Sequence, residues 1–229
     1  MNFDTFEKKI GIVFADKDLL HTAFTHRSYL NEHRGTKTEH NERLEFLGDA
    51  VLELLTTEFL FKKYPHKAEG DLTMYRAGLV NAVTLAGVAE GLGMNGYMLL
   101  SKGEAKDTGR AREVILANAI EALIGALYLD GGYAKAGDFV SRFVLSLTDQ
   151  IVAEGKWLDA KSHFQEKAQD IASVTPLYET VRETGPDHDK HFTVAVFIGR
   201  EKAAEGNGKS KQEAEQAAAA AALKAKQWD

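Results

Sequence analysis

The sequence Asn41-Glu42-Arg43-Leu44-Glu45-Phe46-Leu47-Gly48-Asp49-Ala50-Val51-Leu52 opens a segment in which apolar residues recur periodically as far as about Tyr64. At about 100° per residue, this pattern is typical of an amphipathic helix. The residues expected on its core face form one apolar stripe, namely Leu44, Leu47, Val51, Leu54 and Leu55. Glu42, Glu45 and Asp49 fall almost opposite that stripe. The segment is therefore predicted to be a helix with a core face and an acidic face.

The acidic face has two interpretations. Acidic residues near a helix start favour the macrodipole and can simply face solvent. Three carboxylates on successive turns also repel one another unless cations lie between them, which suits a divalent metal. Phe46 is expected on the acidic side, where a large aromatic residue indicates a partner surface. Gly48 costs ~1 kcal/mol relative to alanine inside a helix, which indicates that another group approaches the backbone closely.

A second element, Ile115 to Leu129, is apolar nearly all round and is predicted to be a buried helix. An ionised Glu121 in such a helix is costly without a counter-charge. Asn118 lies one turn earlier on the same face. The pair is either a set of metal ligands or a hydrogen-bonded polar pair, and the metal site is the favoured hypothesis.

Composition sets the outer limits. The chain has 229 residues, of which 44% are hydrophobic, enough for one large domain or two ordinary ones. A net charge of −6 argues mildly against a nucleic-acid partner, so local basic patches must decide. No run has the length of a signal peptide or a membrane span, which predicts a cytoplasmic location. The absence of cysteine excludes disulfides and thiolate zinc sites.

Composition changes near Gly155, and a smaller pattern follows. Its predicted elements come in the order helix, three strands, helix, and they are Lys161–Ile171, Leu177–Glu183, Phe192–Ile198, Lys202–Gly206 and an alanine-rich helix from Ser210. The sequence thus predicts an all-α domain over 1–154, a linker over 155–160 and a small α+β domain with αβββα order over 161–229.

The block from His40 to Leu52 closely resembles the signature of bacterial ribonuclease III, the double-strand-specific endoribonuclease, and the resemblance continues through Gly132. It implies a helical nuclease domain that forms a homodimer through Phe46. The implied ligands of Mg²⁺, for which Mn²⁺ is a plausible substitute, are Glu45, Asp49, Asn118 and Glu121. Asp49 and Glu121 are the implied catalytic residues. Glu42 and Glu69 match further acids near the family's cutting site.

The αβββα pattern resembles a double-stranded-RNA-binding domain, through Gly185-Pro186-Asp187-His188 and Gly208-Lys209-Ser210-Lys211. An A-form duplex is recognised mainly by shape, through minor-groove and phosphate contacts. The resemblance implies groove contacts from Gln165, Glu166 and His188. It implies phosphate contacts from Lys209 and Lys211, helped by the partial positive charge of a helix start. From residue 158 onward, ten Lys and Arg face twelve Asp and Glu, so we expect modest, salt-sensitive affinity.

One position departs from the family pattern, because aspartate is usual where this chain has Asn118. An amide oxygen can coordinate Mg²⁺, but it brings one less negative charge, so metal affinity should fall. The implied function is hydrolysis of duplex RNA in ribosomal and messenger RNA precursors, leaving 5′-phosphate and 3′-hydroxyl ends. The rival hypothesis is a dimer that binds duplex RNA and cleaves it poorly. A purely structural helical protein would leave Glu121 unexplained.

Overall fold

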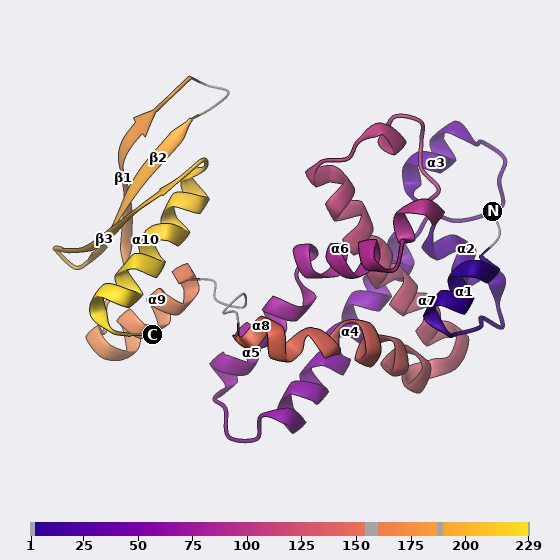
Figure 1. The fold of residues 1–229 in the computed structure, drawn as a ribbon, viewed down its shortest axis with the longest axis horizontal. Helices are drawn as coiled ribbons and strands as arrows, with labels where there is room; N and C mark the ends of the chain where they lie inside the picture. The colour runs from indigo at the N-terminus through magenta and orange to yellow at the C-terminus, as the bar shows by residue number, and fades with distance from the viewer. Residues whose placement is uncertain (1–2, 154–159, 187–189, 229) are drawn as a thin grey trace. The chain divides into compact units, whose positions relative to one another are not determined.

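The computed structural model describes residues 3–153, 160–186 and 190–228, which belong to two compact units (Figure 1). The first unit spans Met1–Trp157 and the second Leu158–Asp229. Most of the predicted linker, 155–160, lies outside the described residues, and only Ala160 is described, as the first residue of a helix.

The described part of the first unit is helical, as predicted. Its α-helices are α1 (Asp4–Ile10), α2 (Lys17–Ala23), α3 (Arg27–Glu32), α4 (Glu42–Lys63), α5 (Glu69–Val80), α6 (Ala82–Gly91), α7 (Arg110–Phe143) and α8 (Thr148–Ala153). Its short 3-10 helices are η1 (Met94–Tyr97), η2 (Glu104–Lys106) and η3 (Leu145–Leu147). One continuous apolar core joins these helices, with α4 packed along α7 at its centre.

The helix predicted from the opening stretch is α4. It ends at Lys63, because Tyr64 precedes Pro65 and is pushed out of the helical region. The prediction that Leu54 belongs to the core face is wrong, since Leu54 is 58% exposed. Because α7 packs on the side of α4 that carries Gly48, the core shifts away from Leu54. The residues of α4 that are buried are Leu44, Gly48, Val51, Leu52, Leu55, Thr56 and Leu60.

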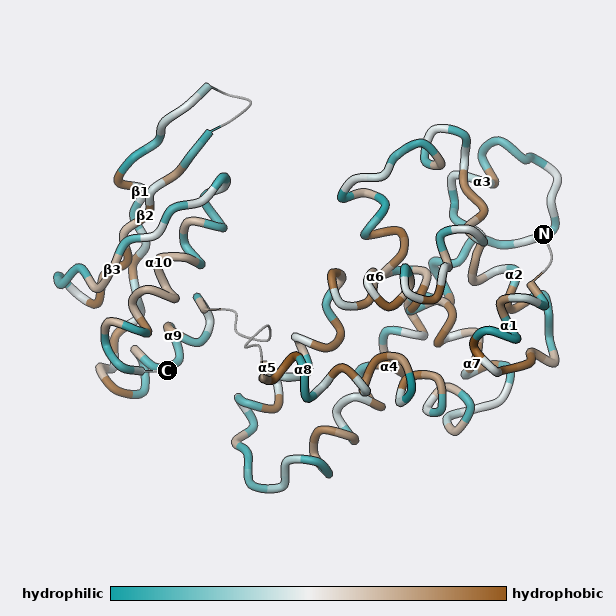
Figure 2. The backbone as a smooth tube through the Cα atoms, viewed as in Figure 1, coloured by the Kyte–Doolittle hydropathy of each residue, from teal (hydrophilic) through white to brown (hydrophobic). Residues whose placement is uncertain are grey.

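The predicted buried helix is the first part of α7, and Figure 2 shows hydrophobic residues predominating along it. The helix bends at Gly132, whose φ of 76° is a left-handed conformation that favours glycine. Among the described residues, one helical stretch, Arg110–Ala153, is by itself long and apolar enough to cross a membrane. Its most apolar window is 61% buried inside the unit, as in the core helix of a folded domain.

The second unit has the predicted αβββα order, with α9 (Ala160–Ala172), β1 (Leu177–Thr184), β2 (His191–Ile198), β3 (Glu201–Gly208) and α10 (Lys211–Lys226). The strands form one antiparallel sheet in the order β1-β2-β3. α10 packs across β2 and β3 and also contacts α9. Phe164, Val196 and Leu223 meet in a small core between the sheet and the two helices.

Candidate active site

The acidic face of α4 meets α7 where the two helices approach most closely. A Cβ added to Gly48 would stand 1.7 Å from the backbone oxygen of Glu121 and 2.8 Å from the backbone nitrogen of Gly125. A Cβ on Gly125 would stand 2.2 Å from the backbone oxygen of Leu44. The expectation that another group approaches Gly48 is therefore confirmed, and that group is the backbone of α7. This contact brings the acids beside Gly48 close to Glu121.

The environment of Glu121 raises the pKa of its carboxyl group. Burial raises its pKa, and the negative charges of Asp49 and Glu45 raise it further, to about 7. None of the groups that shift this pKa is a cation. The sequence predicted a buried Glu121, whereas in the structure its side chain is half-buried. A carboxylate without a counter-charge, beside two others, is an environment that a bound cation would stabilise.

Asn118 lies on the same side of α7 and interacts with Glu45 across the two helices. Burial and the charges of Glu42 and Asp49 raise the pKa of Glu45, while a side-chain hydrogen bond from Asn118 opposes that shift. In this bond the amide N–H donates to the carboxylate, which an aspartate at position 118 could not do when ionised. The structure thus brings Glu45, Asp49, Asn118 and Glu121 into one neighbourhood.

The donor set fits a hard divalent cation, because it offers carboxylate and amide oxygens with no sulfur or imidazole. Across the described ranges, however, no three His, Cys, Asp or Glu side chains converge closely enough to hold a metal ion. Like charges on facing helices repel, so a cation between these carboxylates would offset that repulsion. The arrangement is a set of neighbouring donors rather than a closed coordination shell.

The two secondary candidates, Glu42 and Glu69, lie on different helices. Glu42 is exposed at the start of α4, where its carboxylate pairs with Arg27 at 3.3 Å and approaches Nδ1 of His40 at 3.7 Å. Glu69 is in the first turn of α5, accepts a hydrogen bond from Thr73 Oγ1 at 2.9 Å and lines a hollow of about 390 Å³. Glu42 is among the groups that shift the pKa of Glu45, and Glu69 is not.

Phe46 is 84% exposed, as expected for a residue on the acidic side of α4. It borders a hollow of about 820 Å³ whose apolar lining comes from three separate elements. The apolar residues of that lining are Leu19, Leu44, Phe46, Leu47 and Leu129. No local pattern indicates that Leu19 and Leu129 line the same hollow as Phe46, because each belongs to an element with its own apolar periodicity.

The structure describes four of the five residues that are predicted to contact RNA in the second unit. Gln165 and Glu166 are exposed on α9, while His188 lies outside the described residues. Lys209 is exposed just before α10. Lys211 Nζ pairs with Glu183 at 3.1 Å and lies 5.7 Å from the centre of the Phe192 ring.

Two hydrogen bonds between side chains and the backbone cap the start of α10. Ser210 Oγ accepts a hydrogen bond from the backbone N–H of Glu213 at 3.1 Å, and Glu213 accepts one from the backbone N–H of Lys209 at 2.8 Å. The pair is similar to a capping box, except that Glu213 binds the N–H of the residue before the N-cap Ser210. It fixes the backbone at the helix start, where the helix dipole would attract a phosphate.

The comparisons with known proteins follow the same division. Residues 16–147 match the family described as Ribonuclease-III-like, and residues 160–226 match the double-stranded RNA binding motif. A protein named Ribonuclease 3 from Streptococcus pneumoniae (strain P1031) is 49% identical over 210 residues, 91% of this chain and 90% of its own length. Ribonuclease 3 from Streptococcus agalactiae serotype Ia is 46% identical over 95% of both chains.

A solved structure of the nuclease domain of ribonuclease III from Campylobacter jejuni is similar to the first unit. It is 40% identical, with a TM-score of 0.58, and the match covers 63% of this chain and 97% of that one. That work concerns structural flexibility in the region of the Campylobacter domain that is involved in dimer formation. The two matched domains, their order and the identity to proteins of the same length lead to one conclusion: this chain belongs to the ribonuclease III family, the endoribonucleases of double-stranded RNA.

Proposed function

We propose that this endoribonuclease cuts duplex RNA with Mg²⁺ held between α4 and α7. The observation that carries the proposal is the close contact at Gly48, which sets Asp49 beside Glu121. Burial and the negative charges of Asp49 and Glu45 raise the pKa of Glu121 to about 7. Asp49 and Glu121 are assigned as the catalytic acids that hold the metal, with Glu45 and Asn118 as further oxygen donors. Mn²⁺ is a plausible substitute, because it accepts the same oxygen ligands.

When bound, the metal would lower the pKa of the attacking water and neutralise charge on the phosphate and on the leaving 3′-oxygen. The chain's own residues prepare that site. Glu121 is available as a carboxylate once a cation offsets Asp49 and Glu45, and Asn118 holds Glu45 in place by its hydrogen bond. The expected products carry 5′-phosphate and 3′-hydroxyl ends. Glu42 and Glu69 remain secondary candidates at the cutting site, and the RNA substrates implied are ribosomal and messenger precursors in the cytoplasm.

The second unit is proposed to hold the duplex. Gln165 and Glu166 on α9, with His188, would contact successive minor grooves, and Lys209 and Lys211 would contact the phosphates of the major groove between them. The start of α10 supports this assignment, because the partial positive charge of a helix N-terminus lies next to Lys209 and Lys211. Since Lys211 already pairs with Glu183, a phosphate would have to displace that carboxylate.

We also propose a homodimer in which Phe46 of each protomer enters the 820 Å³ hollow of the other. A two-fold interface uses the same patch on both copies, so the patch must contain both the projection and the cavity. This patch contains both, and its lining carries charges of both signs, with Lys37 and Arg43 beside Asp18 and Glu39. The dimer formation described for the Campylobacter nuclease domain supports the assignment.

A second candidate function is a duplex-binding dimer that cleaves little, and Asn118 is the observation that favours it. Incubating long duplex RNA with the full chain separates the two. The nuclease should cut duplex RNA in magnesium but not in EDTA, and should leave a single strand of the same sequence intact. Equal cutting in EDTA would rule out the metal mechanism, and binding without cutting at any magnesium level would favour the second candidate.

A further inference from the structure

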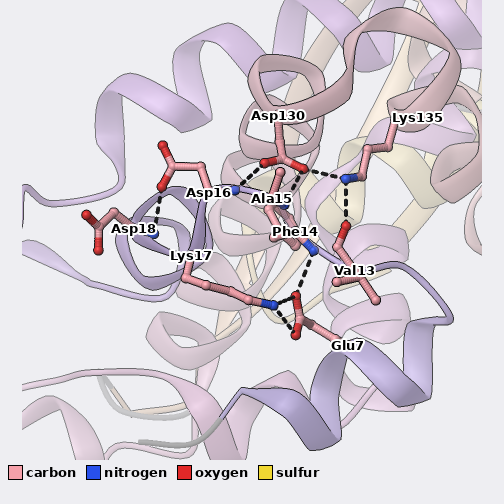
Figure 3. Close-up of polar contacts among 9 residues, drawn as sticks. All are labelled: Glu7, Val13, Phe14, Ala15, Asp16, Lys17, Asp18, Asp130 and Lys135. Carbon is pink, nitrogen blue, oxygen red and sulfur yellow. Dashed lines mark hydrogen bonds and ion pairs between the residues drawn. The ribbon is translucent and has the colours of Figure 1, made fainter.

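The loop between α1 and α2 is held by charged side chains from the second half of α7 (Figure 3). Asp130 accepts hydrogen bonds from the backbone N–H of Asp16 at 2.7 Å and of Ala15 at 3.1 Å. Lys135 pairs with Asp130 and also donates to the backbone oxygen of Val13 at 2.7 Å. The Asp130 side chain is 1% exposed. It is a buried carboxylate with three donors, so its contacts are strong and costly to lose.

The contacts of Asp130 join two elements, α2 and α7, that both contribute side chains to the hollow beside Phe46. Asp16 is the N-cap of α2, which contributes Leu19 and His21 to the lining. Leu129, the residue before Asp130, is the residue of α7 that lines the same hollow. A single carboxylate therefore ties the start of α2 to the end of the straight part of α7, just before the bend at Gly132.

We propose that Asp130 is a positioning residue for the dimer interface, because it fixes the separation between α2 and Leu129 and so keeps the hollow open for Phe46 of a second copy. The inference rests on the proposed homodimer. It goes beyond that proposal by assigning control of the hollow to a residue that lies outside its lining.

The balance of forces at Asp130 agrees with this role. Burial alone would raise its pKa, but the hydrogen bonds from Lys135, Asp16 and Ala15 outweigh burial and hold the pKa below its ordinary value. The carboxylate is thus ionised and fully engaged. An asparagine at this position would keep the shape but lose the charge, and its amide nitrogen would face N–H groups.

Arg142 provides a matched control. It also projects from the second half of α7 to the α1–α2 region, where its Nη2 donates to the backbone oxygen of Ile10 at 2.6 Å. Ile10 ends α1 and does not line the hollow beside Phe46. Arg142→Met therefore removes a comparable anchor without touching α2 or Leu129.

The test measures the dimer dissociation constant by sedimentation over a range of concentrations, together with the free energy of unfolding. The full-length proteins are the natural protein, Phe46→Ala, Asp130→Asn, Lys135→Met and Arg142→Met. Asp130→Asn should weaken the dimer about tenfold, the size of one lost charge-assisted hydrogen bond. Lys135→Met should weaken it less, and it carries the test if Asp130→Asn does not fold. Arg142→Met should leave the dimer constant within about twofold even if it lowers stability.

Two outcomes overturn the inference alone. Either Asp130→Asn and Lys135→Met destabilise the fold without changing dimerisation, or Arg142→Met weakens the dimer as much as they do. If Phe46→Ala has no effect, or the natural protein is monomeric throughout, the proposed dimer fails and the inference falls with it.

Discussion

Gly48 of α4 lies against Glu121 of α7 so closely that any side chain at position 48 would overlap the Glu121 backbone oxygen. The Glu121 atom in this contact is a backbone oxygen, so the overlap could not be relieved by a change of side-chain rotamer. This contact sets the distance between the acids on the two helices, and it is therefore a condition both for stability and for the proposed active site.

Gly48→Ala should lower the free energy of unfolding by about 3 kcal/mol, because an added methyl group must push two backbones apart. It should also reduce cleavage, since Asp49 and Glu121 would separate. Denaturant unfolding and a cleavage assay measure the two effects.

Gly87→Ala is the matched control, because Gly87 is inside α6 and a Cβ there would meet nothing within 4 Å. It should raise stability by about 0.5 kcal/mol through the higher helix propensity of alanine. An alanine at position 48 that is tolerated as well as one at position 87 would show that the two helices are not in tight contact.

Much of this site follows from local sequence. Phe46, Glu45 and Asp49 share a face because helical periodicity puts them there, and an interior glycine already indicates a close neighbour. The identity of that neighbour is a tertiary fact, and so is the exposure of Leu54, which depends on where α7 packs.

The proposed role of Asp130 could not be predicted from the sequence, because it too depends on tertiary contacts. Its backbone partners Ala15 and Asp16 are 115 and 114 residues away in the chain, so no local pattern indicates the contact. By contrast, the strands and the start of α10 were predicted well, because alternation, turn residues and an alanine-rich run are short-range signals.

Asn118→Asp should have opposite effects with and without metal. In EDTA it loses the hydrogen bond to Glu45 and adds a like charge, which should lower the free energy of unfolding by about 1 kcal/mol. In magnesium the extra carboxylate should lower the concentration needed for half-maximal cleavage, on the order of tenfold. Thermal unfolding in EDTA and a magnesium titration measure the two effects.

Asn95→Asp makes the same change at an exposed position in η1 and should alter neither quantity. If Asn118→Asp behaves like this control, Asn118 has no part in the metal site. If it cuts RNA while the natural protein cuts none, the duplex-binding function is the correct one.

Glu121 makes the stability of the metal-free protein depend on pH. The pKa of Glu121 is about 7 in the folded protein, against the ordinary value of about 4.5 in the unfolded chain. Between pH 4.5 and 7 the folded protein therefore binds more protons than the unfolded chain. The stabilisation from protonated Glu121 is fully present below about pH 4.5 and is lost as the pH rises through about 7. Unfolding in EDTA should therefore show a downward component in that range, and Glu121→Gln should abolish it. Glu90→Gln, which removes an exposed carboxylate, should retain it.

Lys209→Ala with Lys211→Ala should lower affinity for duplex RNA and reduce the slope of log affinity against log salt by about 1 to 2, since fewer counterions are released. The control removes Lys224 and Lys226 from the other end of α10, with the same change in net charge. Binding measured at several salt concentrations distinguishes them. Equal slopes for the two double variants would place the phosphate contacts elsewhere.

The most direct test of the central claim is a comparison of binding and cleavage of one duplex RNA by the natural protein and by Glu121→Ala, in saturating magnesium. Because cutting is assigned to the α4–α7 acids and binding mainly to the second unit, Glu121→Ala should bind the duplex with nearly unchanged affinity and produce no cleavage. A Glu121→Ala protein that cuts the duplex at the rate of the natural protein would contradict the assignment of the active site to these two helices.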